Sequence, residues 1–270
     1  MTKKNYYNDI IRLGLPILVG QLGMIVTAFA DNIMVGRYST EALASASFVN
    51  GVFNVVIFCC LGFTYGLTPL VGAMFGQKRM HDIGALMRNG LYLNMTYSMA
   101  LTAALGLLYF HLHRLGQPYE LLPLIRPYYL TALAGIVPVC VFNVFAQWCY
   151  GTTDSSTPMW IILGGNLLNI VGNYALIFGH MGAPELGLTG AGISTLASRL
   201  LTAAAIAAFF IFSKRAAQIR QGFAASRLRG DMLARIWHTS LPVSMQMTFE
   251  SGSFSVAAIM SGWLGAIPLA

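Results

Sequence analysis

The sequence predicts an all-α membrane protein: a six-helix transmembrane bundle followed by the first helix of a second bundle. Of the 270 residues, 56% are hydrophobic and only 9% are charged, whereas soluble domains carry about 25% charged residues. Charge-free apolar stretches long enough to cross a bilayer recur along the whole chain. In addition, the pattern at the start of the chain returns near its end, after six such stretches.

Seven intervals can each hold a membrane-spanning helix of about 20 residues. They are 13–36, a stretch within 42–77, 91–110, 128–150, 158–179, 188–212 and 236–262. The second interval is too long for one upright helix and contains Pro69, so we expect a tilt, a kink or an interfacial turn there. Pro16 and Pro242 are each expected to kink their helix, in the first and last spans.

The basic residues between the spans predict the orientation. With the N-terminus in the cytoplasm, twelve basic residues lie inside and three outside, which satisfies the positive-inside rule. The inside set is Lys3, Lys4, Arg12, Lys78, Arg79, Arg88, Lys214, Arg215, Arg220, Arg227, Arg229 and Arg235, and the outside set is Arg37, Arg114 and Arg126. The net charge of +7 therefore reflects membrane topology, and we expect no nucleic-acid partner.

A shift of 226 residues aligns the chain with itself. It pairs Pro16 with Pro242 and gives eight identities between residues 9–44 and 235–270, a pattern typical of transporters with internal repeats. We therefore expect a six-helix lobe over 1–212, a cytoplasmic linker over 213–235, and the first helix of an incomplete C-terminal lobe over 236–270. The first span could instead be a cleaved signal peptide, because a small-x-small pattern, Ala28-Phe29-Ala30, follows its apolar run. Chance similarity between apolar segments is the alternative to a true repeat.

Asp31 is the first candidate site residue. It lies inside the first span, about 9 Å from the outer end by the helical rise, and a carboxylate in the hydrocarbon region is expensive. At the C-terminal end of its helix the macrodipole also disfavours an anion. Asp31 could exchange a proton or coordinate Na⁺, or it could simply reach water at the membrane surface.

Glu250 and Asn173 fall at similar depth on two other spans, and two more asparagines share a helical face with Asn173. Glu250 lies in the seventh span between Phe249 and Phe254, and Asn166, Asn169 and Asn173 form one stripe on the fifth. We expect these residues to meet Asp31 in one cavity, with Na⁺ bound by Asp31, Asn173 and Glu250 if sodium is the coupling ion. Hydrogen bonding purely for helix packing is the alternative interpretation.

Arg199 is an isolated cation near the middle of the sixth span, and the sequence does not indicate its partner. The chain has no HExxH, P-loop or GxSxG motif, so we expect neither an enzyme nor a structural metal or cofactor.

Several motifs together resemble the multidrug and toxic compound extrusion (MATE) family, in its NorM-like branch. They are LP and DNIMVGR on the first span, N-x-x-N-x-x-x-N-Y followed by IFG and GAPELGLTGAG near the fifth, and LP…FE on the seventh. The resemblance implies the N-lobe of a twelve-helix MATE-type transporter. In it, Asp31 matches the family's first-span acid, Asn169 and Asn173 match polar fifth-span positions, and Glu250 matches the seventh-span acid. The fifth-span aspartate of another branch is not matched.

The family implies a secondary active multidrug exporter that exchanges Na⁺ or H⁺ for small cationic amphipathic substrates by alternating access. It also implies a multi-pass protein of the bacterial inner membrane, surrounded by membrane lipids and completed by a C-terminal lobe that this chain lacks. A lipid-linked saccharide flippase of the wider superfamily is the first alternative, although it would need several cavity cations and the spans contain only Arg199. A non-transporting half-protein is the second.

Overall fold

The structure is a computed structural model that describes residues 3–114 and 118–263, with side chains described for 10–113 and 118–253. Its described part is helical, as predicted. The α-helices are α1 (Lys3–Tyr38), α2 (Thr40–Tyr65), α3 (Leu67–Gly76), α4 (Met80–Tyr109), α5 (Leu122–Ala134), α6 (Ile136–Gly151), α7 (Ser156–Phe178), α8 (Gly187–Phe212), α9 (Ala217–Ala225) and α10 (Gly230–Trp263). Short 3₁₀ turns lie at Leu112–Arg114, Tyr119–Leu121 and Lys214–Ala216.

Six segments are long and apolar enough to cross a membrane, which confirms the predicted six-helix unit. They are Ile10–Tyr38, Thr40–Gly76, Met80–Tyr109, Tyr119–Gly151, Ser156–Phe178 and Gly187–Phe212. The helix predicted over 236–262 forms as α10, but its composition does not place it among these six.

Two of the six segments are broken in the middle, and proline explains both breaks. Pro69 and Pro138 have no N–H to donate to the carbonyl four residues earlier. Those carbonyls belong to Tyr65 and Ala134, the residues at which α2 and α5 end. The first break was expected from the sequence and the second was not. Pro16 and Pro242 lie inside α1 and α10, and their expected kinks stay predictions.

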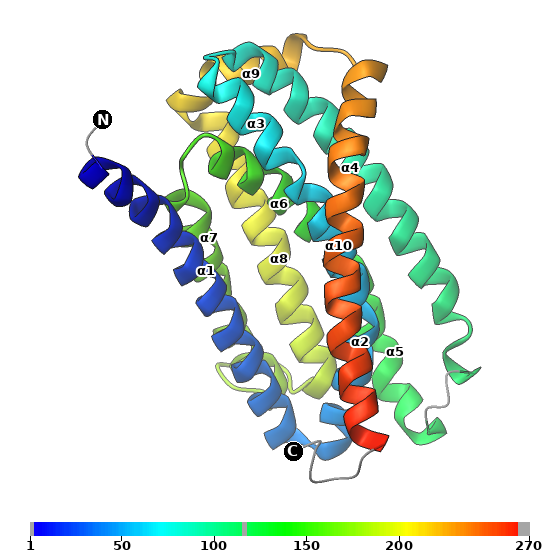
Figure 1. Cartoon of the computed structure of the whole chain (residues 1–270). Helices are drawn as coiled ribbons and strands as arrows, with labels where there is room; N and C mark the ends of the chain where they lie inside the picture. Colours follow the sequence, from blue (N-terminus) through cyan, green and yellow to red (C-terminus); the bar gives the residue numbers. More distant parts are fainter. Residues whose placement is uncertain (1–2, 115–117, 264–270) are drawn as a thin grey trace.

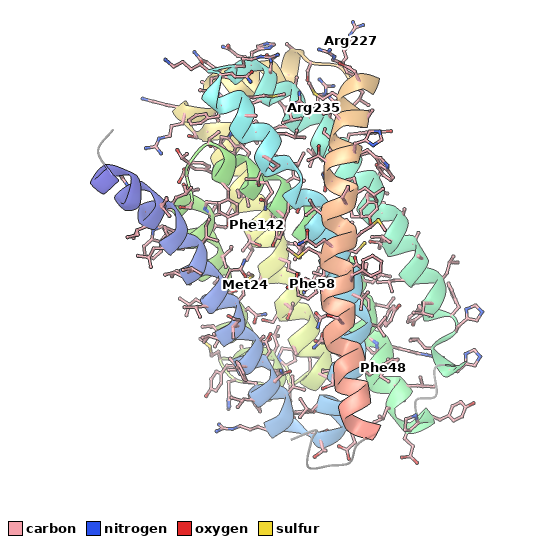
Figure 2. All side chains as sticks on the ribbon, viewed as in Figure 1. Met24, Phe48, Phe58, Phe142, Arg227 and Arg235 are labelled. Carbon is pink, nitrogen blue, oxygen red and sulfur yellow. The ribbon has the colours of Figure 1, made fainter. Side chains whose placement is uncertain are left out.

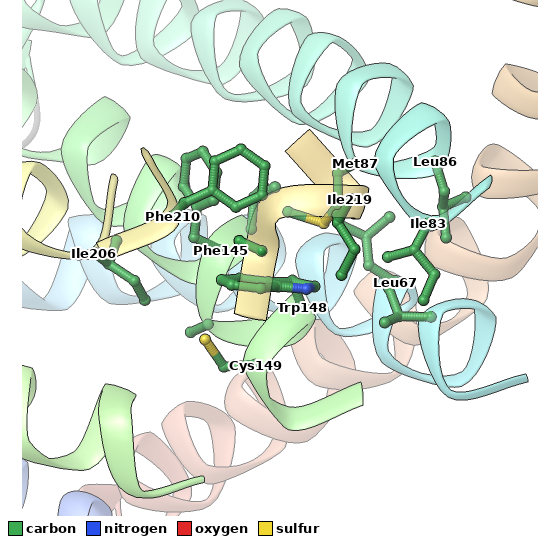
Figure 3. Close-up of a cluster of buried hydrophobic side chains, with 14 of the residues drawn as sticks. Leu67, Ile83, Leu86, Met87, Phe145, Trp148, Cys149, Ile206, Phe210 and Ile219 are labelled. Atoms are coloured by element: carbon green, nitrogen blue, oxygen red, sulfur yellow. The ribbon is translucent and has the colours of Figure 1, made fainter. Parts of the chain in front are cut away.

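The helices pack as a bundle in which α1 lies on α7, α7 on α8, and α10 on α2 (Figure 1). Figure 1 also shows α1 and α10 running in the same direction, as a parallel repeat predicts. The largest buried cluster includes Leu67, Phe145, Trp148 and Phe210 and joins α3, α4, α6 and α8 to α9 (Figure 3).

The segment predicted as a cytoplasmic linker contains α9, which packs on the first turns of α4. Gly84 and Gly222 allow this approach, because a Cβ on either would overlap a backbone carbonyl of the other helix. Arg88 then donates to the carbonyl oxygens of Phe223, Ala224 and Ser226 at the end of α9, where a helix leaves its carbonyls without partners.

Candidate functional site

Asp31 meets Asn173 where α1 packs against α7. The Asn173 Nδ2 atom donates a hydrogen bond to Asp31 Oδ1 at 2.5 Å, and the Asn173 side chain is fully buried. Gly23 helps bring the two helices together, because a Cβ there would lie 2.8 Å from the Leu163 side chain. The structure therefore brings Asp31 together with Asn173 of the predicted asparagine stripe.

The contact continues across α7 to α8 through the asparagines. Asn173 Nδ2 lies 3.4 Å from Asn169 Oδ1, and Asn169 Nδ2 donates to Thr195 Oγ1 at 3.1 Å. Ser194 Oγ also donates to the Asn169 backbone oxygen at 2.9 Å. One polar chain thus links a carboxylate on α1 to a hydroxyl on α8.

Two polar atoms of the asparagine stripe have no hydrogen-bond partner among the described residues. They are the buried Asn173 Oδ1 and the buried Asn166 Nδ2. Most buried polar atoms are paired, but these two have almost no accessible surface, so a ligand could reach them only if the side chains moved. The oxygen is an acceptor and suits a cation, whereas the nitrogen is a donor.

Asp31 lies at the junction of two cavities of about 580 and 470 Å³. Both are lined by Ala28, Asp31, Ile57, Thr195 and Arg199. Asn166 and Asn169 line the larger cavity, together with Met24 and Phe142, which Figure 2 labels. Its other walls are mostly apolar or aromatic, a lining typical of sites for amphipathic small molecules.

Arg199 faces this junction, which gives the isolated cation an electrostatic partner. It interacts with Asp31 through space, but its guanidinium makes no ion pair or hydrogen bond within the described side chains. A Cβ on Gly135 would lie 2.7 Å from Arg199 Nη1, so the break between α5 and α6 provides the room for the guanidinium. The charged groups lining the two cavities are this one base and Asp31.

Glu250 lies apart from these residues. It is exposed on α10, which packs on α2, and it lines neither cavity. The structure therefore brings together Asp31, Asn169 and Asn173 and places Asn166 in the same wall, but it does not bring Glu250 to them. The role predicted for Glu250 stays a prediction.

Sequence reasoning missed Thr195 as part of the site. Thr195, Ser198, Arg199 and Thr202 all line the larger cavity from α8, and their spacing places them on one helical face. This polar stripe in an otherwise apolar span was the signal that could have revealed them.

The six membrane-length segments define a multi-pass membrane protein, with cavities of small-molecule size around an intramembrane acid. A sequence model of the MatE family matches residues 16–175, and the chain belongs to this family. Members of the family are transporters, not enzymes.

Individual relatives agree with this assignment. The chain is 30% identical to a probable multidrug resistance protein NorM of Photorhabdus laumondii, over 93% of this chain and 55% of that protein. It is 28% identical to the multidrug resistance protein MdtK of Klebsiella pneumoniae, over 97% of this chain and 58% of that protein. The chain therefore spans little more than half the length of these relatives.

Solved structures share the fold. A MATE crystal structure in a straight conformation superposes with a TM-score of 0.84 at 23% identity, covering 95% of this chain and 56% of its own. A MOP superfamily transporter from Pyrococcus furiosus, described as having a binding pocket of reverse polarity, gives 0.82 at 23% identity, covering 94% and 59%.

Proposed function

We propose that this chain provides one half of a secondary active multidrug exporter that exchanges Na⁺ or H⁺ for amphipathic organic cations by alternating access. The observation that carries the proposal is Asp31, held by Asn173 at the junction of two cavities. The names of the NorM and MdtK relatives support multidrug efflux. We place the protein in the bacterial inner membrane with its N-terminus in the cytoplasm, as the positive-inside rule predicts.

In this mechanism the Asp31 carboxylate is the group for which the coupling ion and a cationic substrate compete. A ligand shifts the conformational equilibrium only by binding one state more tightly than the other. Exchange follows if the coupling ion favours one access state and the substrate favours the other. A second lobe, of the length by which the relatives exceed this chain, would supply the opposite wall, and Glu250, on α10, is the residue of this chain proposed to contribute to it.

The orientation of the Asn173 amide bears on the choice of ion. Its Nδ2 now faces Asp31, an arrangement that suits a carboxylate without a metal ion. Na⁺ between the two side chains would require the amide to turn its oxygen towards the ion, because metal ions bind oxygen rather than an NH₂ group. A proton on Asp31 Oδ2 requires no such turn.

The flippase alternative gains no support from the cavities. A lipid-linked pyrophosphate calls for several cations, and the two cavities are lined by Arg199 as their one base. The length of the complete gene product tests the half-protein alternative. A product that ends at Ala270 would support it.

The test is uptake of a fluorescent organic cation into inverted vesicles that contain the complete gene product with this sequence. We expect Asp31→Asn to abolish uptake driven by imposed Na⁺ and pH gradients, because the asparagine can neither be protonated nor carry a negative charge. Glu41→Gln is the matched control, since Glu41 is an exposed acid in the first turn of α2. Undiminished uptake by the Asp31→Asn protein would refute the role of Asp31.

A further inference from the structure

A third cavity, of about 1170 Å³, lies at the end of the bundle where α1 begins. It is enclosed by the start of α1, the end of α6, the connection from α6 to α7, and α9. It shares no lining residue with the two central cavities, so it is a separate site to which the export mechanism assigns no role.

Trp148 in the wall of this cavity has an unused hydrogen-bond donor. Its side chain is only 3% exposed, and the Nε1 atom has no partner among the described residues. Figure 3 shows the nitrogen-bearing edge of the indole within the buried cluster, on the side of Leu67 and Ile219 and away from Ile206. The N–H group therefore lies behind the cavity wall and does not reach the space inside it.

The charges around the cavity favour an anion. Arg12 and Arg215 line it together with one acid, Asp154. Arg215 Nη1 lies 3.8 Å from Asp154 Oδ2, whereas Arg12 makes no ion pair with the described residues. Asp154 is further occupied by accepting hydrogen bonds from the N–H and hydroxyl of Thr157 at the start of α7. Among the described residues, Arg12 therefore adds a positive charge that no acid pairs with.

The position of the cavity identifies the source of the anion. Ile10 and Leu13 line it beside Arg12, at the point in the sequence where the polar start of the chain gives way to its first apolar run. This is the level at which apolar acyl chains give way to headgroups and at which basic residues contact anionic lipids. We propose that this cavity binds the phosphate group of an anionic phospholipid, held by Arg12 and Arg215.

Native mass spectrometry of the purified chain, titrated with phosphatidylglycerol and with phosphatidylcholine, tests the proposal. We expect one saturable phosphatidylglycerol molecule and no comparable phosphatidylcholine binding. Combining Arg12→Gln with Arg215→Gln should weaken phosphatidylglycerol binding by about tenfold, since a hydrogen bond to a charged group is worth about that factor or more. Trp148→Phe, which removes an N–H group that does not reach the cavity, should leave binding unchanged. Asp154→Asn, which keeps an acceptor for Thr157, should strengthen it.

Arg79→Gln is the matched control, because Arg79 is exposed, lies between α3 and α4, pairs with Asp82, and does not line the cavity. Equal losses in the control and in the double variant, or equal binding of both lipids, would overturn the proposal. Displacement of the lipid by millimolar inorganic phosphate would assign the site to a soluble phosphate instead.

A second measurement does not depend on the folding of any variant. Tryptophan fluorescence of the unmodified chain should be quenched saturably by phosphatidylglycerol with brominated acyl chains. Brominated phosphatidylcholine should lack this saturable component, and equal quenching by the two lipids would count against the site.

Discussion

Two asparagines three residues apart on α7 carry the same amide but differ in their partners. Asn169 bonds to Thr195 and lies next to Asn173, whereas Asn166 makes no side-chain hydrogen bond to the described residues and has a buried unpaired Nδ2. Asn169→Leu should therefore lower the free energy of unfolding by about 1–3 kcal/mol, because it leaves buried partners unpaired. Asn166→Leu removes an unpaired donor and should cost nothing.

Reversible unfolding in mixed micelles, followed by circular dichroism, measures the two free energies. Each variant is the control for the other, since both place the same leucine on the same helix. Equal destabilisation by the two leucines would show that the hydrogen bond to Thr195 does not contribute.

Arg199 sets the charge of the central cavities. Because it balances Asp31 there, Arg199→Gln leaves the acid as the remaining charge and should tighten the binding of a lipophilic cation several-fold. Equilibrium dialysis with tetraphenylphosphonium measures this affinity. Arg126→Gln is the control, because Arg126 is exposed on α5. If the two variants bind the cation equally, Arg199 does not act on the site.

At the scale of elements, the docking of α9 on α4 depends on glycine. A Cβ on Gly84 would overlap the backbone of α9 at Ile219, whereas a Cβ on Gly106 of the same helix meets nothing within 4 Å. Gly84→Ala should therefore displace α9 and speed tryptic cleavage at Arg227 and Arg229. Gly106→Ala should leave cleavage unchanged and stabilise α4 by about 0.5–1 kcal/mol. Cleavage at one rate in both variants would contradict the need for glycine at position 84.

The helices themselves could be predicted because the bilayer sets their length and excludes charge. The breaks were harder to place. The sequence drew attention to Pro69 through the length of its interval, whereas Pro138 lay in an interval of ordinary length, although it breaks its segment in the same way. Proline alone does not place a break, because Pro16 and Pro242 also leave a carbonyl unpaired and yet lie inside the continuous helices α1 and α10.

At the scale of the whole molecule, the residue types of the central site could be predicted better than the helices that contribute them. Depth along each span follows from the helical rise, so Asp31 and Asn173 could be matched from sequence. Which helices are neighbours depends on packing between distant segments, and depth carries no such information. For this reason Glu250 was expected beside Asp31, whereas α10 packs on α2, and Arg199 had no assigned partner until its surroundings were seen.

The packing of α10 on α2 joins the first helix after the linker to the six-helix unit. A disulfide to the native Cys59 on α2 can test this packing. Ser244 Oγ lies 3.3 Å from the thiol of Cys59 and donates to the Cys59 carbonyl oxygen at 2.7 Å. The backbones are close here, since a Cβ on Gly62 would lie 2.7 Å from Ser244 Cα. Ser244→Cys should therefore form a disulfide with Cys59, because side chains this close allow the short Cβ–Cβ distance that a disulfide needs.

A shift in gel mobility after mild oxidation, reversed by reductant, detects this disulfide. Ser253→Cys is the control, because Ser253 is exposed on the same helix and bonds to the backbone of Glu250. If oxidation crosslinks the Ser253→Cys protein as readily, or leaves the Ser244→Cys protein unlinked, α10 does not rest on α2 as described. If transport requires α10 to move relative to α2, the same disulfide should stop cation uptake by the complete gene product, and reductant should restore it.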